Sequence, residues 1–411
     1  MVAALLGAAV LLIGCGGGSA PASTSASSPV SVKGQTSTGN VLAVVVDAGP
    51  NGNAVNQLFA TVTICQAGST TVCQVIDHVL VDTGSTGLRL LSAVLNPDLN
   101  LAKLSGASGL PLLNCAQFID ASYAWGPVAV ADVVLGGETA SSVPIQIIGD
   151  PSYVQVPRQC SMHRRGTAIN SVAALGAKGI LGIGLFQEDC GSACASSSAN
   201  GYYYTCNNAA CTAPSGTTVA LNRQLKNPVA LFASDHNGYV VNLPAVASAG
   251  ASSLSGSLIF GIATQSNNVF ASGAVLATDS SGYVTTQIAG SAAFGSSFFD
   301  TGSNGLYFDS STLTSCPAGA NGAGFYCPGT TVNATASVVG SNVVSVQVPF
   351  AVANGATLLG SSGLTALPGL AGSMGMADAF DWGLPFFYGR RVFVSMEGQT
   401  SSLGVGPLIA F

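Results

Sequence analysis

The sequence predicts an all-β protein, because of its composition and the spacing of its apolar runs. Of its 411 residues only 7% are charged, whereas 48% are hydrophobic and 52 are glycine. A protein built from long helices would need more charged residues on its solvated faces. Here Ser, Thr, Asn and Gly supply the polar surface, and short runs of Val, Ile, Leu and Phe are separated by glycine-rich turns. This usage favours many short strands.

The apolar runs mark where strands are expected. Examples are residues 41–46, 58–64, 128–135, 143–148, 257–262, 338–348 and 391–395. Helices should be few, with one or two turns expected between residues 363 and 380. The net charge of −6 and the pI near 4.8 argue against the basic patch that nucleic-acid binding requires, so we expect no nucleic-acid partner.

The N-terminus has the pattern of an export signal. Residues 2–13 form an apolar run that is too short to cross a bilayer but has the length of a signal-peptide core. The run ends in Leu-Ile-Gly-Cys at residues 12–15, which resembles a bacterial lipobox. That resemblance implies a lipoprotein signal over residues 1–15, with lipid on Cys15. The alternative is an ordinary secretory signal that happens to contain a cysteine. Residues 16–40 then form a low-complexity tether.

The same resemblance predicts where the protein is found. We expect a lipid-anchored protein of the bacterial cell envelope, whose anchor lies in a membrane. Gly16 rather than Asp follows the lipidated cysteine, which favours the outer membrane in a host with two membranes.

The cysteine count also points to an exported chain. Eleven cysteines are too many for a typical reduced cytosolic protein, and without Cys15 the remaining ten suit five disulfides. Two pairs have the spacing of disulfides that close a short loop, Cys65 with Cys73 and Cys316 with Cys327. Four more lie in an insertion rich in Ser, Asn and Tyr, namely Cys190, Cys194, Cys206 and Cys211. Their spacing superficially suggests zinc, but paired disulfides are the better interpretation, so we expect no metal and no cofactor.

One sequence unit occurs twice: apolar residues, Asp-Thr-Gly-Ser, one polar residue, then Gly-Leu. The first copy contains Asp82 and the second contains Asp300. A single copy is explained equally well as a turn whose Asp bonds its own backbone and whose Gly supplies positive φ. Two matched copies instead suggest two halves related by approximate two-fold symmetry, each offering one carboxylate at the axis.

From about Val41 to the C-terminus the sequence resembles pepsin-like aspartic proteases. Besides the two Asp units, four ordered segments carry the resemblance, residues 131–137, 179–184, 256–262 and 382–394. The resemblance implies a bilobal fold with two pseudo-symmetric, β-barrel-like lobes. Residues 41–240 would form the lobe that holds Asp82, and residues 241–411 the lobe that holds Asp300.

The paired units imply a definite chemistry. Like charges about 3 Å apart cannot both ionise, so the two carboxyls share one proton, and aspartic proteases are the standard example of this effect. One Asp then acts as general base on a water and the other as general acid. The small glycines let the two loops approach, and the hydroxyls supply hydrogen bonds. The supporting residues are Thr83, Gly84, Ser85, Thr301, Gly302 and Ser303.

Two positions depart from the family pattern. The family has a flap tyrosine that closes over substrate, and the best candidate here is Tyr123, although only eight residues separate it from Asp132. A core or surface tyrosine is the alternative. Asp381 stands where the family has an aliphatic residue beside the second Asp loop. If it faces the two carboxylates it should perturb their pKa, and if it faces solvent it should be harmless.

These observations predict an aspartic-type endopeptidase that acts on peptide or protein substrates and works as a monomer. The alternative is a catalytically inactive pepsin-like lipoprotein that binds peptides or proteins. A third possibility is a structural envelope lipoprotein whose repeat only preserves the fold. The three histidines, His78, His163 and His236, are scattered and have no triad or metal spacing.

Overall fold

The computed structural model describes residues 39–411 except 108 and 209, and strands dominate it. Strands account for 42% and helices for 10%, and the sheets are barrel-like, which confirms the prediction of an all-β protein. The predicted signal with Cys15, and the tether as far as residue 38, lie outside the described residues. Within the described part, no helix has the length and apolarity needed to cross a bilayer.

The strands are short and follow one another closely along the chain. They are β1 (Val41–Val46), β2 (Leu58–Gln66), β3 (Cys73–Asp82), β4 (Thr86–Leu91), β5 (Ala102–Lys103), β6 (Leu112–Gln117), β7 (Ser122–Leu135), β8 (Glu138–Ile148), β9 (Thr167–Ala168), β10 (Gly179–Ile183), β11 (Tyr203–Thr205), β12 (Ser215–Gly216), β13 (Gly238–Asn242), β14 (Leu254–Phe260), β15 (Val275–Ala277), β16 (Val284–Ile288), β17 (Phe294–Asp300), β18 (Leu306–Phe308), β19 (Val332–Val339), β20 (Ser345–Val352), β21 (Ala371–Gly372), β22 (Phe380–Gly383), β23 (Arg391–Ser395), β24 (Thr400–Ser401), β25 (Gly404–Val405) and β26 (Leu408–Ala410).

The helices are no longer than two turns. They are α1 (Val172–Leu175), α2 (Ser192–Ser196), α3 (Gly355–Gly360) and α4 (Leu384–Phe387), with 3-10 turns η1 (Ser92–Val94), η2 (Pro97–Leu99), η3 (Met162–Arg164), η4 (Leu221–Arg223), η5 (Pro228–Leu231) and η6 (Ser266–Asn268).

The N-terminal half forms a closed barrel. Strand β2 pairs with β3, β3 with β10, β10 with β4, β4 with β8, β8 with β7, and β7 again with β2. The barrel closes around Val and Ile side chains such as Val62, Val79 and Ile145, which are fully buried. Closure leaves few free strand edges, which suits strands that are apolar on the inner face.

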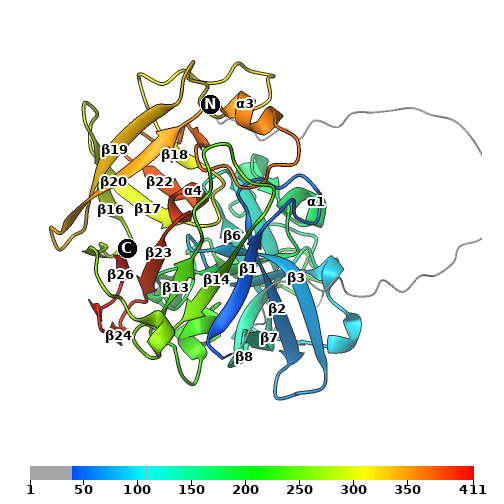
Figure 1. The fold of residues 1–411 in the computed structure, drawn as a ribbon. Helices are drawn as coiled ribbons and strands as arrows, with labels where there is room; N and C mark the ends of the chain where they lie inside the picture. The colour runs from blue at the N-terminus through cyan, green and yellow to red at the C-terminus, as the bar shows by residue number, and fades with distance from the viewer. Residues whose placement is uncertain (1–38, 108, 209) are drawn as a thin grey trace, which may run out of the picture.

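The C-terminal half is built on a seven-stranded sheet in the order β20-β19-β16-β17-β22-β18-β21. Its core is aromatic. Phe380 stacks on Phe308 with ring centroids 4.6 Å apart, and on Trp382 at 4.2 Å. Figure 1 shows this sheet at the upper left, and β2, β3, β7 and β8 at the lower right. One contiguous hydrophobic core therefore runs through both halves, and it is aliphatic in the barrel and aromatic in the C-terminal sheet.

A third group of strands connects the two halves, in the order β1-β14-β13-β23-β26-β15. Strand β1 also pairs with β2 of the barrel, so the connecting strands continue the barrel sheet. The predicted boundary between residues 240 and 241 falls inside β13. The predicted boundary would therefore divide a strand of this shared sheet.

Two local expectations are wrong. Residues 338–348 do not form one strand but the facing ends of β19 and β20, because Gly340 to Val343 make a turn and Val343 adopts a positive φ of 57°. The expected helical turns between residues 363 and 380 are absent from that segment. A helix forms earlier, at α3, where the Asn354 side chain caps the N-terminus by accepting from the Thr357 amide.

The expectation of five disulfides is confirmed. Cys65 bonds Cys73 and Cys316 bonds Cys327, as the spacing predicted. In the insertion, Cys190 pairs with Cys194 and Cys206 with Cys211, so disulfides and not zinc take these four thiols. The remaining bond joins Cys115 to Cys160.

Candidate functional site

The two Asp loops occupy matching places in the two halves. Strand β3 ends at Asp82 and β4 begins after the loop, and β10 lies parallel to β3 and antiparallel to β4. In the other half β17 ends at Asp300, and β22 lies parallel to β17 and antiparallel to β18. A glycine is paired with each Asp, Gly182 with Asp82 and Gly383 with Asp300. The sequence repeat is thus a repeat of three-dimensional structure.

Each carboxylate is held by its own loop. The Gly84 amide donates to Asp82 Oδ1 at 2.8 Å, and Ser85 Oγ donates to Oδ2 at 2.5 Å. At Asp300 the Gly302 amide donates to Oδ1 at 2.7 Å and Ser303 Oγ donates to Oδ2 at 2.8 Å. Hydrogen bonds of this kind fix the orientation of a carboxyl group and favour its charged form.

The two loops are cross-linked by their threonines. The Thr301 amide donates to Thr83 Oγ1 at 2.9 Å, and the Thr83 amide donates to Thr301 Oγ1 at 3.2 Å. Each hydroxyl then donates across to the opposite strand, Thr83 to the Phe299 carbonyl at 3.0 Å and Thr301 to the Val81 carbonyl at 2.7 Å. Both threonines are buried. This reciprocal set fixes the distance between the two halves at the site.

The glycines permit a very close approach of the two carboxyls. A Cβ placed on Gly84 would lie 2.7 Å from Asp300 Cγ, and one on Gly302 would lie 2.9 Å from Asp82 Oδ1. No side chain fits there, so glycine is required at both positions. Each carboxyl group therefore lies against the other loop.

The electrostatics of the pair are unequal. Burial raises the pKa of Asp300 well above its usual range, and the charge of Asp82 and a hydrogen bond between the two carboxyls raise it further. The Gly302 amide and the Ser303 hydroxyl offset only part of this. Asp300 therefore keeps a proton at a pH where an ordinary aspartate has lost it. The arrangement can hold one proton between two carboxyls, which is what general acid–base chemistry needs.

Two residues near the pair could not be identified from any local sequence pattern. Tyr239 on β13 is buried and donates to the Ile183 carbonyl at 2.6 Å. Burial raises the pKa of its phenol, and the charges of Asp82 and Asp300 add to the effect. Asn56 donates to the Asn304 carbonyl at 2.8 Å, which ties an N-terminal turn to the second Asp loop. Both act across more than 50 residues of sequence, so no local pattern reveals them.

The hairpin of β6 and β7 provides the residue proposed as a flap tyrosine. Tyr123 lies in β7, paired with Gln117, and its half-buried ring packs against the cluster around the Cys115–Cys160 disulfide. It is therefore next to the turn and not in it. The turn itself carries Asp120, whose charge contributes to the raised pKa of Tyr307, after burial and the charge of Asp381. The tip of the hairpin thus lies on the side of the second Asp loop.

Asp381 does not face solvent, so that alternative is excluded. It is 1% exposed, and neither carboxylate oxygen has a hydrogen-bond partner among the described residues. Burial raises its pKa well above the usual range, and the charge of Asp300 raises it further. The charge of Asp300 therefore acts on the Asp381 carboxyl.

A family model matches residues 36–411, a range that includes all of the described residues. The chain belongs to the DUF3443 family. The family is described as a protein of unknown function. A search of curated proteins finds no match to this chain.

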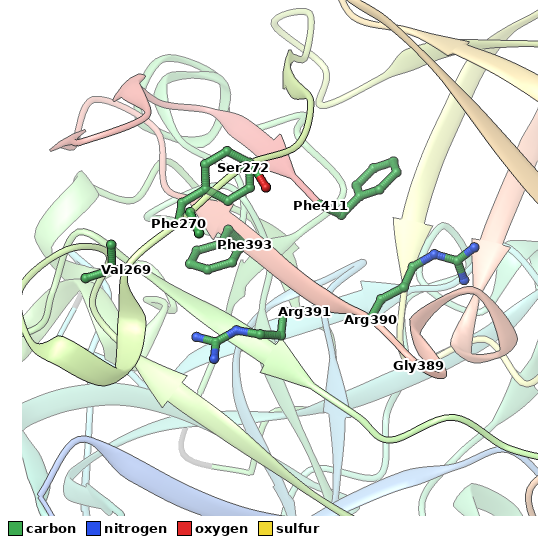
Figure 2. A pocket seen from close by; sticks show the side chains of 9 residues that line it. Val269, Phe270, Ser272, Gly389, Arg390, Arg391, Phe393 and Phe411 are labelled. Atoms are coloured by element: carbon green, nitrogen blue, oxygen red, sulfur yellow. The ribbon is translucent and has the colours of Figure 1, made fainter.

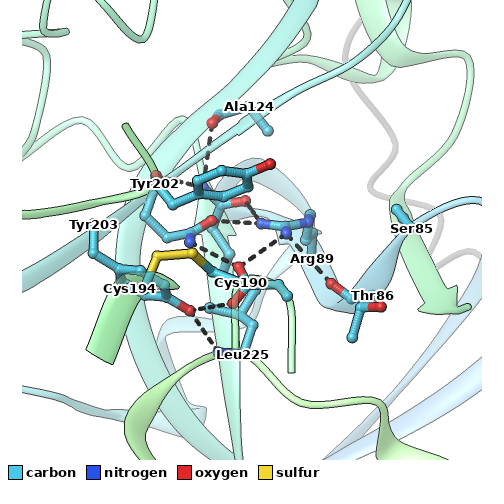
Figure 3. Close-up of polar contacts among 12 residues, drawn as sticks. Ser85, Thr86, Arg89, Ala124, Cys190, Cys194, Tyr202, Tyr203 and Leu225 are labelled. Carbon is cyan, nitrogen blue, oxygen red and sulfur yellow. Dashed lines mark hydrogen bonds and ion pairs between the residues drawn. A yellow bond between two sulfur atoms is a disulfide. The ribbon is translucent and has the colours of Figure 1, made fainter. Parts of the chain in front are cut away.

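In this DUF3443 protein a buried polar network adjoins the first Asp loop (Figure 3). Arg89 on β4 donates to Asn114 Oδ1 at 2.6 Å and to Gln146 Oε1 at 2.7 Å, and it pairs with Asp189 at 3.4 Å. From the disulfide-rich insertion, Tyr203 donates to Asp189 at 2.6 Å. The network therefore joins the strand after Asp82 to the hairpin strand β6, to β8 and to the insertion.

A separate hollow of about 480 Å³ lies beside the N-terminal end of β23 (Figure 2). Figure 2 shows Arg390 and Arg391 extending in opposite directions beside it, and the guanidinium of Arg390 lies 4.6 Å from the ring centre of Phe386. Its lining includes Phe270, Phe393 and neither of the paired aspartates. Among the described residues of this DUF3443 chain, no His, Cys, Asp and Glu side chains are grouped to hold a metal. The paired carboxyls are therefore the candidate site.

Proposed function

We propose that this protein is an aspartic-type endopeptidase with a pepsin-like bilobal fold. The observation that carries the proposal is the approach of the Asp82 and Asp300 carboxyls, each packed against the glycine of the other loop. The threonine cross-link and the matching strands β3-β10-β4 and β17-β22-β18 support the two-lobed arrangement. The raised pKa of Asp300 supports a pair that shares one proton.

In the proposed reaction Asp82 is the base and Asp300 the acid. Asp82 accepts bonds from the amides of Gly84 and Ser85 and from the Ser85 hydroxyl, which favour its charged form. Asp82 takes a proton from water as the water oxygen bonds the peptide carbonyl carbon, and Asp300 gives its proton to the carbonyl oxygen. The tetrahedral intermediate then collapses, the C–N bond breaks, and Asp82 returns the proton to the leaving amine while Asp300 regains its own.

We further propose that the protein is a monomer anchored in the bacterial cell envelope, on the outer membrane, by lipid on Cys15. This part rests on the lipobox-like sequence and on the disulfides, which suit an oxidising compartment. Its substrates would be exposed peptide segments or unfolded proteins in that compartment.

Hydrolysis of an unfolded protein between pH 3 and pH 7 tests the activity. Asp82→Asn and Asp300→Asn should each lower kcat by at least about 10³-fold, because each removes one member of a unit that acts together. Asp98→Asn is the matched control, since Asp98 is exposed and its carboxylate has no hydrogen bond or ion pair among the described residues. Cleavage that survives in both site variants would reject the assignment.

The placement of Tyr123 in β7, outside the hairpin turn, favours the alternative of an inactive binding protein. A peptide whose central hydroxyl mimics the tetrahedral intermediate separates the two functions. An active pair binds such a peptide more tightly than the same peptide without the hydroxyl, by a factor of at least about 10². Equal affinity for the two peptides, measured by calorimetry, would favour the binding protein.

A further inference from the structure

Asp381 projects from the same face of the sheet as Asp300. Strand β22 lies between β17 and β18, and Asp381 is paired with Phe298 on one side and Tyr307 on the other. Side chains alternate along a strand, so Phe298 and Asp300 share one face and Phe299 takes the opposite one. Paired residues project from the same face. The carboxyl of Asp381 is therefore on the reactive face, one strand away from the pair.

Among the described residues, no cation forms an ion pair with Asp381. The groups that face it are the carboxyls of Asp300 and Asp82, the Tyr307 phenol and the Ser303 hydroxyl. Every ion pair between described residues involves other acids. The Tyr307 hydroxyl already donates to the Asn304 side chain, and Ser303 donates to Asp300. Among the described residues Asp381 is thus a buried carboxyl without an ion pair, and only the nearby Ser303 hydroxyl favours its charged form.

The other half of the molecule shows that this carboxyl is not needed for the fold. The equivalent position on β10 is Ile180, paired with Leu80 and with Arg89. Ile180 is 2% exposed and belongs to an apolar cluster with Ile148. An isolated charge buried in this place would be strongly destabilising, so a protonated carboxyl is the form compatible with the structure.

We propose that Asp381 is a positioning residue that stays protonated while the Asp300 loop is intact, and that its ionisation releases the loop as the pH rises. Ser303 has a single hydroxyl proton, which it donates to Asp300 Oδ2 at 2.8 Å. When Asp381 loses its proton to water, its charged oxygens become a second acceptor for that hydroxyl. Ser303 then turns from Asp300, which loses a hydrogen bond. The inference concerns regulation of the site proposed above but does not require turnover.

The sign of the pH effect follows from linkage. The pKa of Asp381 is raised in the folded protein above the ordinary aspartate value of 3.8. The folded state therefore holds a proton that the unfolded state has released. The stabilisation is complete below the ordinary pKa and is lost as the pH rises through the raised one. A neutral side chain at position 381 removes this dependence.

Thermal unfolding of the full chain from pH 4 to pH 8 tests the proposal, with Asp381→Asn, Asp381→Ile and the control Asp98→Asn. At pH 4 the neutral variants should unfold near the wild-type temperature, and at pH 7 at least about 2 °C above it. Asp98→Asn should follow the wild type throughout. The proposal is overturned if the variants that fold keep the wild-type pH dependence. It is also overturned if neither variant folds at pH 4, where a neutral side chain should be tolerated.

Binding of the peptide with the central hydroxyl gives a second, local readout. Its affinity for the wild type should fall at least about tenfold more between pH 5 and pH 7 than its affinity for Asp381→Asn. Equal losses would mean that Asp381 does not act on Asp300. If neither protein binds the peptide at either pH, the proposed peptidase function fails, and the unfolding temperatures still decide the role of Asp381.

Discussion

The strands around Asp82 and those around Asp300 have the same arrangement but different neighbours. In the first half, Ile180 on β10 is paired with Arg89 on β4. At the equivalent place in the second half, Asp381 on β22 is paired with Tyr307 on β18. Arg89 forms a buried ion pair with Asp189, whereas no cation in the described part of the chain pairs with Asp381. The symmetric part of the site is the part that brings two carboxyls together. The residues that differ determine what stabilises each half. The first half depends on the Arg89–Asp189 ion pair, and the second depends on a protonated Asp381.

Removing Arg89 should have the largest effect on stability. Arg89→Met leaves Asp189 buried without its counter-charge, and loss of one partner of a buried pair typically costs about 3–5 kcal/mol. The cost should be smaller at acidic pH, because burial already raises the pKa of Asp189 and protonation removes its charge. Urea unfolding at pH 4.5 and pH 7 measures this. A second change, Asp189→Asn, should recover part of the loss at pH 7, and no recovery would contradict the ion-pair explanation.

The threonine cross-link should show whether the two halves are equivalent where they meet. Thr83→Val and Thr301→Val each remove one hydroxyl and leave a buried amide and a buried carbonyl without partners, at about 1–3 kcal/mol. Because the bonds are reciprocal, the two losses should be similar and the double variant should lose less than their sum. Urea unfolding of the three variants gives these free energies. Strict additivity would mean that the two threonines do not act as one unit.

The smallest expected effect concerns Tyr307. Tyr307→Phe removes the hydroxyl that donates to the Asn304 side chain and should lower the free energy of unfolding by about 0.5–1.5 kcal/mol. Its counterpart in the first half is Arg89. The ratio of the unfolding free energies lost in Tyr307→Phe and in Arg89→Met therefore shows how much more this position contributes to stability in the first half. A loss as large as that of Arg89→Met would contradict the comparison. The same unfolding assay serves for both variants.

Much of the arrangement near the two loops could be predicted from the sequence. Asp82 and Asp300 were expected to meet because their flanking residues match, and strands β1 and β23 have the predicted bounds. The disulfides Cys65–Cys73 and Cys316–Cys327 followed from spacing. These features depend on residues that are near in sequence or on a repeated pattern, and such signals can be read directly.

Other parts of the site could not be predicted because they depend on distant contacts. Arg89 and Asp189 are 100 residues apart, and nothing near either of them indicates the partner. Whether Asp381 faces solvent depends on the strands on either side of it, and the sequence left that open. The turn within residues 338–348 has apolar residues on both sides, so the sequence pattern alone predicts one strand where the structure has two.

The pairing of β1 with β14 has a consequence for how the chain folds. Val41 is paired with Ile259, so the first described strand finds one of its neighbours only after more than half of the chain has been synthesised or exported. Contacts that join distant residues slow folding, because a long loop must be closed before they form. Strand β1 would keep one edge unpaired until β14 is available to pair with it. A fragment that ends before residue 254 should therefore leave β1 exposed and prone to pair with other chains.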